Sequence, residues 1–253
     1  MNPLTYFAFF RYVPTLREYR RFSQSKKLPA GYQIIKGRVV SKANRYLLAG
    51  TLKRQTISRN KIQQKIHLLK FLGGLPWIKY LGISGTVSML NAQPKDDIDL
   101  FVITKANKLW TARFWLIIIT LVLGVRRKPK DKNYRNKLCL NLFFSEANLK
   151  IPKRKQTQYV AHEILQLKTI VNKDETYEEL LLANLWVSEL FPQAPMPNYP
   201  RVKRVEPFVG ARGMEKLLRR WQLFLINRHR TQEIVTDTQL WFFPDDFEKK
   251  LPF

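Results

Sequence analysis

The sequence has few of the residues that build covalent crosslinks and zinc sites. It contains one cysteine, Cys139, and three histidines, which lie far apart in the chain. A single cysteine excludes an internal disulfide, and the wide spacing of the histidines gives no short zinc-ligand pattern. The first ten residues also lack the basic stretch and apolar centre of a signal peptide. These absences favour a cytoplasmic protein.

Acidic residues are scarce relative to basic ones. The chain has 45 Lys and Arg against 19 Asp and Glu, which gives a formal net charge of +26. A charge of this size attracts polyanions, and nucleic acid is the first candidate. The charge is also compatible with an anionic membrane surface, or with a lineage in which all proteins are basic.

Apolar runs long enough to cross a bilayer are also lacking. The most apolar run covers residues 114–123 and is preceded by Arg113. It is shorter than the roughly 18–20 residues that a membrane-spanning helix needs. A buried helix is therefore favoured over membrane insertion, and we expect no membrane partner.

The pattern along the 253 residues predicts an α+β fold in three parts. Residues 1–75 read as helices with a short hairpin near Lys36 and Gly37, which fits a winged-helix-like module or a plain helical scaffold. Residues 76–150 alternate strands and helices and predict a small mixed-sheet core. Residues 151–253 read as a helical domain.

Two motifs in the central part carry chemistry. A strand over residues 78–84 runs into Gly85 and Thr86, and a second strand over 97–104 begins with Asp97 and Asp99. Two carboxylates separated by one strand residue point to the same face. Magnesium prefers such oxygen ligands, and backbone N–H groups at a strand-to-helix turn can hold phosphates.

Ser84-Gly85-Thr86-Val87-Ser88, followed by Asp96-Asp97-Ile98-Asp99-Leu100-Phe101, resembles the motif of the DNA polymerase beta superfamily of nucleotidyltransferases. Thr86 stands where that family usually has serine. The resemblance covers about residues 78–150. The flanks, at 6–19 and 177–187, look more weakly like those of other nucleotidyltransferase-domain proteins.

The resemblance implies transfer of a nucleoside monophosphate from a nucleoside triphosphate, with ATP favoured, to an acceptor hydroxyl on RNA. Asp97 and Asp99 would be the catalytic ligands of two Mg²⁺ or Mn²⁺ ions. Ser84, Gly85 and Thr86 would hold the phosphates. The alternative is a catalytically weak or inactive member that binds nucleic acid or nucleotide. Transfer to a small molecule or a protein is a third possibility.

The family normally places a third carboxylate on a neighbouring strand, here expected over residues 138–144. The polar residue on that strand is Asn141, which cannot act as a general base. It fits a metal ligand or a structural residue equally well. Glu146 lies just beyond the strand and is a candidate to reach the site.

A basic loop over residues 126–137 lies between the second and third strands of the core. Its cations predict contact with a nucleic-acid backbone, with Tyr134 available for stacking; a solvated loop is the simpler alternative. The candidate nucleic-acid-binding residues are Arg126, Arg127, Lys128, Lys130, Lys132, Arg135 and Lys137.

Overall fold

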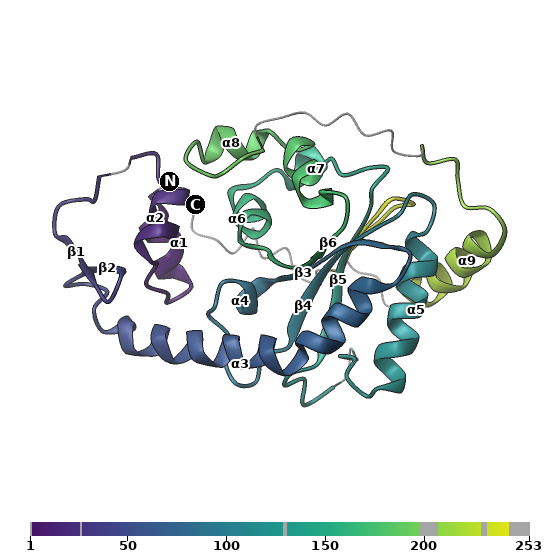
Figure 1. Ribbon diagram of the computed structural model, residues 1–253, viewed down its shortest axis with the longest axis horizontal. Coiled ribbons are helices and arrows are strands. Elements are labelled where there is room, and N and C mark those ends of the chain that lie inside the picture. Colours follow the sequence, from purple (N-terminus) through teal and green to yellow (C-terminus); the bar gives the residue numbers. More distant parts are fainter. Residues whose placement is uncertain (1, 26, 129–130, 198–206, 229–231, 243–253) are drawn as a thin grey trace.

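The computed structural model describes residues 2–25, 27–128, 131–197, 207–228 and 232–242. In this part of the chain a six-stranded sheet has the order β6-β3-β4-β5-β8-β7 (Figure 1). Strands β4 and β5 are parallel, and all other neighbours are antiparallel. The strands are β3 (Ile78–Ser84), β4 (Ile98–Thr104), β5 (Leu138–Ser145), β6 (Lys168–Asn172), β7 (Ile234–Val235) and β8 (Gln239–Trp241). The predicted mixture of helices with a mixed sheet is confirmed.

The alternation of side chains in β4 separates two apolar clusters. Ile98, Leu100 and Val102 belong to one cluster, and Phe101 and Ile103 belong to the other. Both faces of the central strands are therefore covered, which is why β4 reads as an almost continuous apolar run. The first strand begins and ends as predicted, and the other two differ from their expected ranges by one residue.

Helices cover the sheet on both faces. On the Leu100 face lie α3 (Leu47–Gly74), α5 (Leu109–Val122) and α9 (Gly213–Asn227). The Phe101 face is covered by α1 (Pro3–Phe9), α2 (Leu16–Phe22), α6 (Gln158–Gln166), α7 (Thr176–Leu182) and α8 (Trp186–Leu190). Two short helices complete the set, α4 (Gly85–Ser88) and the 3₁₀ turn Lys153–Lys155. Among the described residues, no helix combines the length and apolarity needed to cross a bilayer.

The N-terminal part contains the predicted hairpin. Strands β1 (Tyr32–Ile35) and β2 (Arg38–Ser41) are joined by Lys36 and Gly37, both with positive φ, as a two-residue hairpin turn requires. Helix α3 then extends for 28 residues, about 42 Å, from the hairpin to the sheet (Figure 1). Phe7 and Phe22 share a cluster with Phe101, so this part and the core have a common interior. A module boundary at residue 75 stays a prediction.

The C-terminal part, for which a helical domain is predicted, contains strands as well as helices. Besides its helices, this part supplies β6 on one side of the three predicted strands and β8 with β7 on the other. These strands have five, three and two residues. Strands β7 and β8 are too short to show a two-residue period, and the sequence of β6 does not alternate between apolar and polar residues.

Candidate functional site

Asp97 and Asp99 lie on one face of the sheet, where β4 begins. Ile98, between them, points into the opposite apolar cluster. Asp99 is opposite Ser84 of β3 and Cys139 of β5. Ligand atoms of Asp97, Asp99 and Cys139 all lie within 4.8 Å of one another. The predicted carboxylates therefore converge, and Cys139 joins them. Its place two residues before Asn141 was the signal that could have identified it.

The turn after β3 lies directly against Asp99. Gly85 has φ +65°, and a Cβ at this position would lie 2.6 Å from Oδ2 of Asp99. Glycine alone adopts this positive φ without strain and has no Cβ to clash with the carboxylate. The glycine of the motif is therefore required by the approach of the turn to the carboxylate.

Glu163 of α6 also belongs to this site, although no motif in the sequence points to it. Its Oε2 accepts a hydrogen bond of 3.1 Å from the backbone N–H of Gly85. Next to it, the Thr86 hydroxyl donates to Oδ2 of Asp96, also at 3.1 Å. The Gly85 N–H and the Thr86 hydroxyl, which were expected to hold phosphate, thus donate to carboxylates of this chain. A phosphate that binds here has to replace these partners.

Burial raises the pKa of three groups of the site, Asp99, Glu163 and Cys139. Burial, followed by the charges of Asp97 and Glu163, raises the pKa of Asp99 to about 8, against the opposing effect of Arg127. Burial also raises the pKa of Glu163 to about 7. The Cys139 thiol has a raised pKa because it is buried beside the same aspartates. The site carries more negative charge than its surroundings neutralise, an arrangement that favours a cation.

Asn141 occupies a bulge in β5 and contacts Asp99. The register between β4 and β5 shifts after Leu100, which leaves Asn141 without a paired residue. Its Nδ2 donates to Oδ1 of Asp99, and its Oδ1 accepts from the Cys139 thiol at 2.8 Å. In this arrangement Asn141 offers a nitrogen, not an oxygen, to the carboxylate. It orients Asp99 and is not placed as a metal ligand.

The expectation that Glu146 could reach the carboxylates is wrong. Ser145 is opposite Thr104, at the far end of β4 from Asp99. Glu146 there accepts from the backbone N–H of Ala106 at 3.1 Å and lies 3.5 Å from Nζ of Lys79. Parallel pairing places the start of β5, and not its end, beside the site.

Within the described part of the basic loop, Arg127 contacts a carboxylate of the site directly. Nη1 of Arg127 lies 2.7 Å from Oδ2 of Asp97, and the Arg127 guanidinium also covers the ring of Tyr134. Arg126, by contrast, is half-buried, and burial lowers its pKa. That Arg126 contacts nucleic acid stays a prediction, and its half-buried side chain is less accessible than the exposed cations of the loop.

The rest of the loop divides between paired and exposed cations. Lys137 pairs with Asp131 at 2.9 Å. Lys128, Lys132 and Arg135 are exposed. Lys130 lies outside the described residues.

Helix α3 continues the surface of this loop. Lys61 is buried, and its Nζ donates to the backbone oxygens of Pro94 and Asp96 and to Oδ1 of Asn136, at 3.0, 2.7 and 2.7 Å. Nδ2 of Asn136 in turn donates to Gln64 at 3.1 Å. The helix contains no acidic residue. It exposes the cations Lys53, Arg59 and Lys70.

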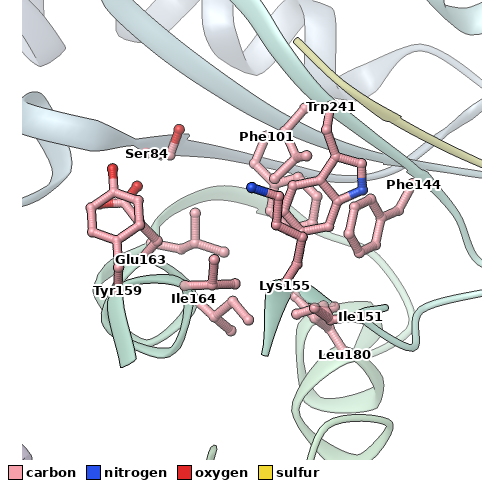
Figure 2. Close-up of a pocket in the computed structure, with 13 residues that line it drawn as sticks. Ser84, Phe101, Phe144, Ile151, Lys155, Tyr159, Glu163, Ile164, Leu180 and Trp241 are labelled. Atoms are coloured by element: carbon pink, nitrogen blue, oxygen red, sulfur yellow. The ribbon is translucent and has the colours of Figure 1, made fainter. Parts of the chain in front are cut away.

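An apolar pocket begins beside the carboxylates and extends along the same sheet face. Ser84 lies at one end, and Phe101, two residues after Asp99, forms part of the wall. Figure 2 shows Lys155 extending into the pocket, with Glu163 and Tyr159 on the side near Ser84. The cavity of this pocket has a volume of about 50 Å³, and the value rises to about 640 Å³ when the solvent at its mouth is included. The further lining residues are Leu142, Phe144, Ile151, Val160, Ile164, Leu167, Leu180 and Trp241.

Three comparisons with known proteins found no match. No family model, no curated protein and no solved structure matches the chain.

Proposed function

We propose that this protein is a metal-dependent nucleotidyltransferase, which transfers a nucleoside monophosphate from a nucleoside triphosphate to a hydroxyl of RNA. The observation that carries the proposal is the pair Asp97 and Asp99, which lie on one sheet face against the Gly85 turn and beside an apolar pocket. Burial and mutual repulsion keep the pKa of Asp99 high, so a bound cation lowers the free energy of the charged form.

The residues fit a magnesium or manganese ion. Such an ion takes one or two protein carboxylates and completes its shell with water and substrate phosphates. Asp97 and Asp99 supply these carboxylates, whereas the Cys139 thiol is a poor ligand for so hard an ion. The metal would neutralise phosphate charge and activate the attacking hydroxyl.

Two contacts within the site, Gly85 to Glu163 and Arg127 to Asp97, are exchanged for contacts with the triphosphate when it binds. Glu163 releases the N–H of Gly85, which then donates to a phosphate oxygen. Arg127 turns from Asp97 to the triphosphate, since a guanidinium binds phosphate with paired hydrogen bonds. The planar base enters the pocket beside Phe101, with ATP the first nucleotide to test.

The acceptor RNA lies along α3 and the basic loop. Lys53, Arg59, Lys128, Lys132 and Arg135 are exposed there. Cations spread over a surface without acidic residues on the helix bind a phosphate backbone in a salt-dependent way.

A second candidate is a binding protein without turnover. It is favoured by one observation, that Gly85, Asp97 and Asp99 are each hydrogen-bonded to another side chain of the protein. In that case the same fold binds nucleotide or RNA. The ligand displaces Glu163, Arg127 or Asn141 from these contacts, but no nucleoside monophosphate is transferred.

The test is incorporation of label from each of the four nucleoside triphosphates into RNA, with Mg²⁺ or Mn²⁺. We expect incorporation by the wild-type protein, and at least a hundredfold loss, about the scale of one catalytic group, in Asp97→Asn and Asp99→Asn. The control is Asp174→Asn, an exposed acid that pairs with Lys79 far from the site.

RNA binding is measured in parallel as a function of salt. Lys53→Gln with Arg59→Gln should lower the slope of log affinity against log salt by about 1.4–1.8. Binding without incorporation for any nucleotide establishes the second candidate. Absence of incorporation, of RNA binding and of binding of all four nucleoside triphosphates by calorimetry overturns both candidates.

A further inference from the structure

In the described part of the chain, helices α5 and α9 carry more than half of the exposed large apolar side chains. Of the sixteen large apolar side chains that are exposed in the described part of the chain, nine lie on these two helices or at their ends. They are Trp115, Leu121, Val122, Leu123, Met214, Leu217, Trp221, Phe224 and Leu225. An apolar surface concentrated in one place indicates an interaction site.

Helix α9 presents an apolar stripe to solvent. Met214, Leu217, Trp221 and Phe224 follow one another at intervals of three and four residues, which places them on one face. Their exposed fractions are 66%, 62%, 46% and 58%. The opposite side of the helix faces α5, where Gln222 is buried and its Nε2 donates to the backbone oxygen of Trp110 at 2.8 Å. Met214, Leu217 and Phe224 are thus more than half exposed while the buried side of the helix holds α9 against α5.

The stripe continues onto α5. The ring of Phe114 contacts the ring of Trp221 edge-on, with centroids 5.9 Å apart. Trp115 and Val122 are two turns apart on α5 and are both exposed. Figure 1 shows the two helices side by side at one end of the sheet. We call the nine exposed side chains of these helices the α5/α9 face.

Exposed cations flank the α5/α9 face. Lys216 and Arg220 are one turn apart on α9, next to Leu217 and Trp221, and Arg212 and Arg228 lie at its two ends. The guanidinium of Arg228 lies 4.3 Å from the centre of the Phe224 ring. The one acid of α9, Glu215, is buried against the start of α5. The exposed part of α9 thus combines apolar and positive groups and carries no negative one.

We propose that the α5/α9 face docks on an anionic membrane surface, with α9 lying in the plane of the lipid headgroups. Leu, Trp and Phe on one stripe with Lys and Arg beside it are the features of helices that bind in this plane. The cations lie where phosphate headgroups would meet them, and the net charge of +26 attracts the protein to such a surface. The expectation of no membrane partner rested on the length of the 114–123 run, and a helix that lies on a surface needs no such length.

Two other occupants fit this face less well. A second copy in a two-fold dimer would bring the cations that flank this face in one copy near those of the other, and like charges repel one another. Nucleic acid would pair with these cations, but its phosphate backbone offers nothing apolar to Met214 and Leu217. A bilayer satisfies both halves of the face, because headgroups and acyl chains lie within a few ångströms of each other.

The test is flotation of the full chain with vesicles of phosphatidylcholine, with and without phosphatidylglycerol, at physiological salt. We expect binding to the vesicles that contain phosphatidylglycerol. Leu217→Gln with Phe224→Gln should weaken binding to these vesicles at least tenfold. Each change removes roughly the free energy gained when one apolar side chain moves from water into the bilayer. The matched control is Tyr46→Gln with Phe71→Gln, two exposed aromatics at the ends of α3, which should bind as the wild type does.

A second pair of variants separates docking from general charge attraction. Lys216→Gln with Arg220→Gln removes two charges from α9, and Lys53→Gln with Arg59→Gln removes two from α3. The first pair should weaken vesicle binding more than the second. Equal losses, or no vesicle binding by the wild type, overturn the proposal. So does a dimer in sedimentation velocity that Leu217→Gln with Phe224→Gln dissociates, because the face then belongs to a second copy.

Discussion

Helices α3 and α9 both read as basic helices in the sequence, and both cover the same face of the sheet, yet they expose opposite chemistry. Most of the exposed residues of α3 are polar or cationic, with Phe71 an exception. The exposed residues of α9 include four large apolar side chains that follow one another along one face of the helix. The difference lies in which residues are buried. On α3 a lysine is buried and apolar residues pack on the sheet, whereas on α9 a glutamate and a glutamine are buried against α5. The charge of a helix therefore does not say what its outer face binds.

The largest effect we expect is on α3, from Lys61→Ala. The change removes a buried ammonium that donates to Pro94, Asp96 and Asn136, and it leaves three acceptors without their partner. Buried hydrogen bonds to a charged group contribute about 1.5–3 kcal/mol each, and their effects are not additive. The free energy of unfolding should fall by about 3 kcal/mol in urea denaturation.

The control for Lys61 is Lys53→Ala, an exposed lysine on the same helix, which should change stability by less than about 0.5 kcal/mol. If the two variants lose the same amount, Lys61 does not hold the two loops to α3.

The next largest effect is on α9, from Glu215→Ala. Its carboxylate accepts from the backbone N–H groups of Trp110 and Thr111, at 2.8 and 2.9 Å, and from the Thr111 hydroxyl. It therefore caps the start of α5 from another helix, and the loss should be about 2 kcal/mol. Glu189→Ala, an exposed acid on α8, is the control. Equal melting temperatures for the two variants would contradict the capping role.

The sequence predicts the centre of this fold well because its signals are local. A strand, a glycine turn and two aspartates in alternation occur within twenty-two residues, and each constrains the next. Glu163 could not be predicted, because it reaches Gly85 from a helix 78 residues further along the chain. The bulge at Asn141 likewise depends on how β5 pairs with β4. On α9, the sequence does not show that Glu215 and Gln222 are buried against α5 while Met214, Leu217, Trp221 and Phe224 are exposed.

The smallest effect tests whether the outer stripe of α9 is free. Leu217→Gln on α9 and Phe71→Gln on α3 both replace side chains that are more than half exposed. Little apolar surface leaves water when either position folds, so each change should shift the free energy of unfolding by less than about 0.5 kcal/mol. A loss of about 2 kcal/mol for Leu217→Gln alone, measured in urea, would mean that another part of the folded chain covers the stripe. The contrast between the two helices would then be one of packing, and α9 would have no apolar face left to bind a membrane.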